Sequence, residues 1–186
     1  MQIEAARKVF TVEEYYRMAE AGILKPDDRV ELIDGEIVEM SPIGVRHAGC
    51  VNWANQALIA AFGGRAVVSV QNPVQLSDIT EPQPDLALLR PRPDAYRGKK
   101  VETADALLVL EVADTTLAYD RNIKVPRYAA AGVPEVWIED LEHDRLLVYR
   151  DPSGNSYRTA RILGRDDSVS VGAFPDVVFK VSDLLG

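Results

Sequence analysis

Two acidic residues, Asp85 and Glu111, stand where carboxylates could do chemistry. Glu111 is the one acid in the apolar run Ala106–Val112, and a charge in a buried strand is costly unless it is paired or bound to a metal. Asp85 follows the segment Glu-Pro-Gln-Pro and begins another apolar run. If these runs are adjacent strands, the two carboxylates meet at one end of a sheet. Such a pair suits Mg²⁺ or Mn²⁺, which bind a few carboxylate oxygens together with water and a substrate phosphate.

A basic residue, Lys124, could complete such a site. It stands at helical spacing from Asp120 and Tyr128, so the three side chains share a face if Pro126 leaves the turn intact. A lysine beside the two acids would stabilise the charge that develops on a phosphoryl group. The alternative is an exposed ion pair between Asp120 and Lys124, worth a few tenths of a kcal/mol. The two acids have structural alternatives as well, namely an aspartate at a turn and a glutamate neutralised by an arginine.

The segments that must position these residues can be recognised from hydrophobic period and turn residues. Thr11 and Glu14 form the pattern of a helix N-terminal capping box, and Gly22 can end that helix. Asp34-Gly35 is a typical two-residue hairpin turn. Further helices are predicted at 45–62 and at 117–131, the second with a kink at Pro126 or a new start near Val125. Strands are predicted at 29–33, 36–40, 66–70, 85–89, 106–112, 135–139, 145–150, 157–163 and 177–181.

Strands before, between and after these helices predict an α/β fold in which helices flank a mixed sheet. No linker or repeat divides the 186 residues, so we expect a single domain, 1–186, with its core at about 29–150. Two short patterns are given no catalytic role. Pro175-Asp176 is interpreted as a turn, because no buried acid and lysine follow it, and Gly63-Gly64 as a helix stop, because it lacks the residues of a phosphate loop.

The charge balance is unusual for a protein that binds nucleic acid. The net charge is −8, whereas phosphate neutralisation draws on a surplus of lysine and arginine. A basic segment, residues 90–100, could meet phosphates, and a solvated loop is the alternative interpretation. The single cysteine, Cys50, allows no intramolecular disulfide, and neither a signal peptide nor about 18 consecutive apolar residues is found. We therefore expect a cytoplasmic protein with no membrane segment.

Longer motifs surround the candidate residues. In order, they are Asp85-Leu-Ala-Leu-Leu, Leu-Val-Leu-Glu111-Val-Ala-Asp114-Thr-Thr, Asp120-Arg-Asn-Ile-Lys124 and Tyr128-Ala-Ala-Ala-Gly-Val-Pro-Glu-Val-Trp137-Ile. Together they resemble the Uma-type restriction endonucleases, a family of the PD-(D/E)xK nuclease superfamily. The resemblance extends from about Phe10 to the C-terminus and includes the hairpin Glu31-Leu-Ile-Asp-Gly-Glu. It implies a restriction-endonuclease-like fold with an N-terminal helix and β-hairpin.

The resemblance also implies roles for individual residues. Asp85 and Glu111 match the catalytic acids that bind metal in the superfamily. Ala113 stands where the strict pattern has lysine, and Lys124 matches a lysine moved to the following helix. The resemblance therefore implies a catalytic set of Asp85, Glu111 and Lys124, with Asp85 and Glu111 as the metal ligands.

Four further residues are secondary candidates: Glu31, His47, Asp120 and Tyr128. Glu31 and His47 match positions that face the site in the resembled family, while Asp120 and Tyr128 share the helical face of the lysine. His47 also belongs to the apolar stripe of the helix at 45–62. A histidine with a satisfied place in the core is the alternative interpretation of His47.

The resemblance implies a magnesium-dependent endodeoxyribonuclease that hydrolyses DNA phosphodiester bonds. The alternative is a nuclease fold that no longer cuts and serves as a binding or assembly module, which the net charge of −8 and the lack of an appended DNA-reading module favour. A small-molecule hydrolase using His47 is a weaker hypothesis, because no Gly-x-Ser-x-Gly pattern accompanies it. A homodimer is expected, because many enzymes that cut DNA pair two sites.

Overall fold

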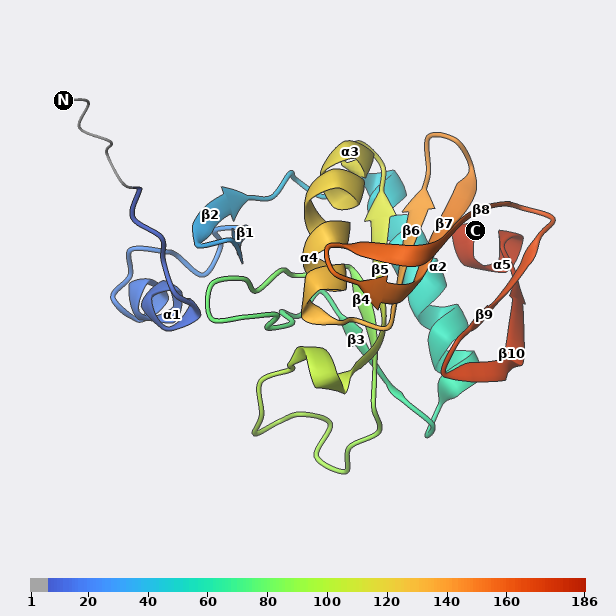
Figure 1. The fold of residues 1–186 in the computed structure, drawn as a ribbon, viewed down its shortest axis with the longest axis horizontal. Coiled ribbons are helices and arrows are strands. Elements are labelled where there is room, and N and C mark those ends of the chain that lie inside the picture. Colours follow the sequence, from blue (N-terminus) through green and yellow to red (C-terminus); the bar gives the residue numbers. More distant parts are fainter. Residues whose placement is uncertain (1–6) are drawn as a thin grey trace.

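The first helix of the chain forms where the sequence predicted it. The computed structural model describes residues 7–186 (Figure 1). Helix α1 (Val12–Glu20) begins after Thr11, whose hydroxyl accepts a hydrogen bond from the Glu14 amide at 3.1 Å. In return, the Glu14 carboxylate accepts a hydrogen bond from the Thr11 amide at 2.9 Å. This reciprocal capping box confirms the predicted helix start.

The predicted hairpin is also confirmed. Strands β1 (Val30–Ile33) and β2 (Glu36–Glu39) pair antiparallel around Asp34-Gly35. The two turn residues have φ values of 51° and 74°, which is the positive-φ conformation that a two-residue hairpin turn requires. A Cβ atom on Gly35 would also collide with the Val9 side chain. Glycine is therefore needed for the turn and for the close passage of the chain before α1.

The centre of the molecule is a six-stranded mixed sheet. Its strands, in spatial order, are β3 (Val67–Val70), β4 (Leu86–Leu89), β5 (Ala106–Ala113), β6 (Glu135–Asp140), β7 (Arg145–Ser153) and β8 (Ser156–Gly164). Strands β5 and β6 are parallel, and the other neighbouring pairs are antiparallel. Strands β4, β5 and β6 are buried along their whole length. Burial on both faces explains why β4 and β5 are apolar except at Glu111, whereas β6 carries three acids, Glu135, Glu139 and Asp140.

Helices cover both faces of the sheet, as Figure 1 shows. The apolar stripe of α2 (Val45–Phe62) packs on one face. The opposite face is covered by a helical segment made of α3 (Leu117–Tyr119), a π-helix (Asp120–Lys124) and α4 (Val125–Ala131). The predicted α/β fold with a mixed sheet between helices is confirmed. Within residues 7–186, no helix is long and apolar enough to cross a membrane.

The helical segment changes from a π-helix to an α-helix just before Pro126. This proline occupies the first turn of α4, where a missing amide hydrogen is tolerated. The predicted new helix start near Val125 is therefore confirmed. The residues just before it form the π-helix, a rare winding that is frequent at functional sites. Because a π-turn is wider than an α-turn, Asp120 and Lys124 are not separated by one regular α-helical turn.

The C-terminal region differs from the prediction. Strands β9 (Ser168–Val171) and β10 (Phe174–Lys180) form a small antiparallel sheet that packs with α2 and is followed by α5 (Ser182–Leu185). Neither β9 nor α5 was predicted, and the interpretation of Pro175-Asp176 as a turn is wrong, because both residues lie in β10. The pairing register shifts between Phe174 and Val178. Such a bulge accepts proline, which has no amide hydrogen to donate.

One acid of the core has no partner. Glu139, on β6, is 0% exposed, and within the described part of the chain neither of its carboxylate oxygens has a hydrogen-bond partner. Burial, and secondarily the charge of Asp85, raises the pKa of Glu139 well above its ordinary value of 4.5. The folded protein therefore holds this carboxyl group in its neutral form at pH values where the unfolded chain ionises it.

We predict that Glu139→Gln raises the free energy of unfolding at pH 8 by about 1–3 kcal/mol. Because the folded pKa is raised, the parent binds more protons folded than unfolded above pH 4.5, so its stability falls as pH rises. The variant should lose that part of the pH dependence. Urea unfolding at pH 5 and pH 8 measures both effects, with the exposed Glu142→Gln as the control. Equal stability of variant and parent at pH 8 would contradict the prediction.

Candidate active site

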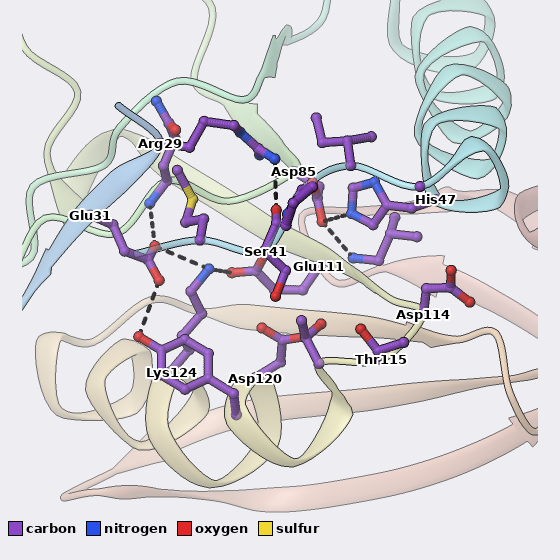
Figure 2. Close-up of a pocket in the computed structure, with 18 of the residues that line it drawn as sticks. Arg29, Glu31, Ser41, His47, Asp85, Glu111, Asp114, Thr115, Asp120 and Lys124 are labelled. Carbon is purple, nitrogen blue, oxygen red and sulfur yellow. Dashed lines mark hydrogen bonds and ion pairs between the residues drawn. The ribbon is translucent and has the colours of Figure 1, made fainter. Parts of the chain in front are cut away.

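A pocket of about 720 Å³ lies at the ends of β4 and β5, between the N-terminal hairpin and the helical segment that begins with α3 (Figure 2). Six of the seven candidate residues line it: Glu31, His47, Asp85, Glu111, Asp120 and Lys124. The seventh, Tyr128, is fully buried beside it. These side chains come from β1, α2, β5, the start of β4 and the helical segment, so only the tertiary fold brings them together.

Asp85 lies immediately before β4 and is anchored by three groups. Its Oδ2 accepts a hydrogen bond from the Val112 amide at 2.9 Å and lies 3.1 Å from His47 Nε2. Its Oδ1 accepts a weaker hydrogen bond from the Gln71 side-chain amide at 3.3 Å. Burial raises the pKa of Asp85, but these contacts, His47 first, outweigh it, and the net shift is downward. Asp85 is therefore held as a carboxylate at a fixed place.

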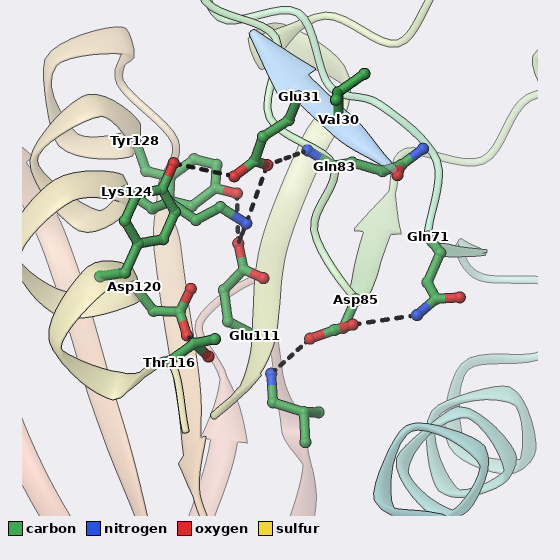
Figure 3. A network of polar contacts seen from close by, with 12 residues as sticks. Val30, Glu31, Gln71, Gln83, Asp85, Glu111, Thr116, Asp120, Lys124 and Tyr128 are labelled. Atoms are coloured by element: carbon green, nitrogen blue, oxygen red, sulfur yellow. Dashed lines mark hydrogen bonds and ion pairs between the residues drawn. The ribbon is translucent and has the colours of Figure 1, made fainter. Parts of the chain in front are cut away.

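The Lys124 ammonium group is held between two acids (Figure 3). Its Nζ lies 3.0 Å from Glu111 Oε1 and 3.2 Å from Glu31 Oε2, and all three side chains are at most 6% exposed. The buried Tyr128 hydroxyl donates a second hydrogen bond to Glu111 Oε1 at 2.6 Å. The lysine therefore joins the hairpin, the sheet and the helical segment through charged contacts in a dry environment, where such contacts are stronger than in water.

Burial dominates the protonation of this cluster. The pKa of Glu111 is raised to about 8, because burial and the negative charge of the nearby Asp120 outweigh the attraction of Lys124. The pKa of Asp120 is raised to about 6, again mainly by burial. Burial would lower the pKa of Lys124, but the neighbouring carboxylates raise it by more. Lys124 therefore stays charged in a site with more acids than bases, which a bound cation would stabilise.

Asp120 does not form the exposed ion pair considered for Lys124. Both residues are 5% exposed. Asp120 accepts a hydrogen bond from the Thr116 hydroxyl at 2.6 Å, whereas Lys124 contacts Glu31 and Glu111. The surface-pair interpretation is therefore wrong. It assumed a solvated α-helical face, whereas this π-helical segment turns both side chains toward the sheet.

His47 lies on α2 and faces the pocket. It contacts Asp85 through Nε2. Its Nδ1 is buried without a hydrogen-bond partner among the described residues, so it is not a satisfied core histidine. The contact with Asp85 raises the pKa of His47, and this effect outweighs burial. His47 thus orients Asp85 from the α2 side of the sheet.

Two hydrogen bonds to Glu31 were not found from the sequence. The Gln83 amide donates a hydrogen bond to Glu31 Oε2 at 3.0 Å, and the Tyr119 hydroxyl donates to Glu31 Oε1 at 3.2 Å. Gln83 acts through its backbone, so its residue type carries no signal. Tyr119 lies next to Asp120 in a recognised motif, and that position was its only signal. Both satisfy the oxygens of a buried carboxylate, as a buried ion pair requires.

The basic segment 90–100 does not line the pocket. Arg92 Nε lies 2.5 Å from Asp94 Oδ1, and Lys99 Nζ lies 2.7 Å from Asp105 Oδ2. Lys100 is placed 3.9 Å from the ring centre of Tyr16 on α1. The two ion pairs are local and the segment is mostly exposed, which agrees with the interpretation of the segment as a solvated loop.

The donors of the pocket suit a hard divalent cation. Glu111 makes its contacts with Lys124 and Tyr128 through Oε1, which leaves Oε2 for another partner, and Asp85 lies in the same pocket. Among residues 7–186, no three His, Cys, Asp or Glu side chains converge into a ready metal cage. Mg²⁺ does not need one, because it is commonly held by one or two carboxylates with water and substrate phosphates. The residues present therefore fit such an ion.

A mixed sheet between helices, with acids at the ends of adjacent strands and a nearby lysine, is the arrangement of a restriction-endonuclease-like nuclease fold. The family model of Uma2, described as "Putative restriction endonuclease", matches residues 12–182. The chain therefore belongs to the Uma2 family, which confirms the resemblance seen in its motifs.

A solved structure agrees with this assignment. The crystal structure of a protein from Anabaena variabilis, described as "a putative nuclease belonging to DUF820", is similar with a TM-score of 0.72 at 14% sequence identity. The similarity covers 95% of this chain and 97% of that one. At this identity it shows the fold alone. Among curated proteins, none matches the chain significantly.

We predict that Lys124→Met lowers the free energy of unfolding by about 3–5 kcal/mol, because it leaves Glu31 and Glu111 buried without their shared cation. The exposed Lys25→Met serves as the control and should change stability by less than about 0.5 kcal/mol. Urea unfolding of both variants measures the difference. Parent-like stability of Lys124→Met would show that the buried pairs contribute little.

Proposed function

We propose that this chain is an endonuclease that hydrolyses DNA phosphodiester bonds with Mg²⁺ or Mn²⁺ and acts in the cytoplasm. The observation that carries the proposal is the position of three groups in one pocket. Asp85 and Glu111 come from the ends of adjacent strands, and Lys124 lies 3.0 Å from Glu111. Membership of the Uma2 family supports the same reaction.

Each residue has a defined part in the proposed reaction. Asp85 and Glu111 would hold the cation, which when bound lowers the pKa of water and neutralises phosphoryl charge. Lys124 keeps its positive charge near the phosphate, where negative charge grows in the transition state. His47 and the Val112 amide keep Asp85 in place. Glu31 acts on Lys124 rather than on the substrate, and is therefore a positioning residue.

A nuclease fold that binds without cutting is the second candidate. The contacts of Lys124 favour it, because two carboxylates already compensate the ammonium charge that catalysis would use. The net charge of −8 also weakens attraction to DNA. Catalysis distinguishes the two candidates, because they share the same fold and the same residues.

We predict that the parent nicks supercoiled plasmid and cuts a single-stranded oligonucleotide in Mg²⁺ or Mn²⁺, and that Asp85→Asn lowers both rates by about 100-fold or more. Calorimetry should show tighter Mn²⁺ binding to the parent than to Asp85→Asn. Asp176→Asn is the matched control, because it also changes an aspartate after proline but lies on the surface, 60% exposed, beside Arg65. It should leave cutting and metal binding unchanged.

Two results would contradict this proposal. Cutting by Asp85→Asn at the parent's rate would show that the assigned carboxylate is not needed. A well-folded parent that binds Mn²⁺ but cuts neither substrate would favour the binding module. In the second case the pocket remains a cation site without the proposed hydrolysis.

We also propose that the protein forms a homodimer through the exposed face of α2. No charged residue occurs from Ala48 to Phe62, although 27% of the chain is charged. On the outer side of this helix, Trp53 and Ile59 are each 52% exposed. Interface cores are depleted in charge and enriched in aromatic residues. Two copies, each with a net charge of −8, can meet on this face without opposing like charges.

The spacing along α2 favours an antiparallel pair. The exposed residues Val45, Gly49, Asn52, Gln56 and Ile59 alternate at intervals of four and three, the period of a coiled-coil seam. About a two-fold axis through the middle of the helix, Ile59 faces Gly49 of the partner subunit, so a large side chain meets a small one. Asn52 then faces Gln56 of the partner subunit, and two amides can each donate and accept a hydrogen bond.

We predict that Asn52→Asp/Gln56→Glu dissociates this dimer, raising its dissociation constant by about tenfold or more. Asn52→Asp/Gln56→Lys should stay dimeric, because opposite charges meet in the antiparallel pair. Sedimentation velocity gives the mass, and thermal unfolding checks that both variants are folded. A monomeric parent, or a dimer that neither variant changes, would overturn the interface.

A further inference from the structure

The groups proposed to act on the phosphodiester bond lie inside the protein. Glu111 and Lys124 are 3% and 5% exposed, and the Asp85 side chain is 15% exposed. Figure 2 shows these side chains pointing into the pocket from the sheet on one side and from the helical segment on the other. A substrate must therefore enter the pocket to reach them, because contact with the outer surface is not enough.

The pocket has a wall that restricts entry. Residues 38–44, the end of the hairpin and the chain that follows it, form part of its lining. Arg29 donates a hydrogen bond to the Ser41 carbonyl at 2.8 Å, and the Met40 amide donates one to the Arg29 carbonyl at 2.8 Å. The middle of this wall is therefore attached to the residue that precedes β1. The volume of about 720 Å³ is typical of sites for small molecules. It suits one or two nucleotides and not a double helix.

Two arginines at or near the pocket make contacts within the protein. Arg29 is engaged by Ser41, and Arg46 contacts the Leu141 carbonyl and lies 3.6 Å from Asp114. Double-stranded DNA carries about one negative charge per 1.7 Å of its axis, and proteins bind it by neutralising several phosphates. A net charge of −8 opposes such binding, and it does so more strongly for a duplex, which has a higher charge density than a single strand.

We infer that the substrate of this site is a single-stranded nucleic acid segment, and that duplex DNA is excluded until it opens. The inference rests on the proposed function. A single strand can bend one phosphodiester into the pocket, whereas base pairing holds the backbone of a duplex outside it. Water attacks phosphorus, one P–O ester bond breaks, and the leaving oxygen takes a proton from solvent, which yields a phosphate monoester and an alcohol.

The test compares three substrates with the full chain in Mg²⁺ or Mn²⁺: a labelled single strand, the same strand in a perfect duplex, and a duplex with a central unpaired bubble. The single strand and the bubble should be cut at least about tenfold faster than the duplex. Fluorescence anisotropy in Ca²⁺ should give the same order for binding, which is a readout independent of cutting. Asp85→Asn controls for a contaminating nuclease.

The outcomes separate this inference from the function on which it rests. Equal or faster cutting of the perfect duplex would overturn the single-strand inference and leave the nuclease intact. Hydrolysis of none of the three substrates by a folded, Mn²⁺-binding parent would overturn both. Cutting confined to the single strand and to the bubble would support both.

Discussion

The buried ammonium group of Lys124 is the interaction on which the site depends. It lies 3.0 Å from Glu111 on β5 and 3.2 Å from Glu31 on β1, so one cation joins the sheet, the N-terminal hairpin and the helical segment. Removing three charges from water is expensive, and their attraction offsets this cost only when the remaining oxygens are hydrogen-bonded. Tyr119, Tyr128 and the Gln83 amide supply those hydrogen bonds.

The hairpin is consequently a part of the site. Its turn is attached to the helical segment by Arg127, whose Nε donates to Asp34 at 3.0 Å, and the Glu81 amide donates to the Leu32 carbonyl at 2.7 Å. These contacts hold Glu31 against Lys124. The same attachment closes one side of the pocket, so the residues that position the lysine also limit what can enter.

The two acids of the site have different electrostatic environments. Hydrogen bonds from His47 and the Val112 amide lower the pKa of Asp85, whereas burial raises that of Glu111 to about 8. Two neighbouring carboxyl groups of one pocket therefore have pKa values that are shifted in opposite directions. Environments that push the pKa values of neighbouring carboxyl groups apart are a recurring property of catalytic sites. The description of the Uma2 family as a putative restriction endonuclease is consistent with such a site.

The sequence alone determined most of the elements, because caps, turns and hydrophobic period act over a few residues. Asp85, Glu111 and Lys124 could be selected because acids at strand ends and a lysine in a recognised motif are visible locally. Only the tertiary structure decided that Lys124 faces Glu31, which lies 93 residues away, and that Asp120 is buried beside it. The strand predicted at 177–181 begins earlier, at Phe174, and this start through Pro175 was missed because a bulge depends on its partner strand. Ion pairs and register are contacts between distant segments, and local sequence does not specify which segments meet.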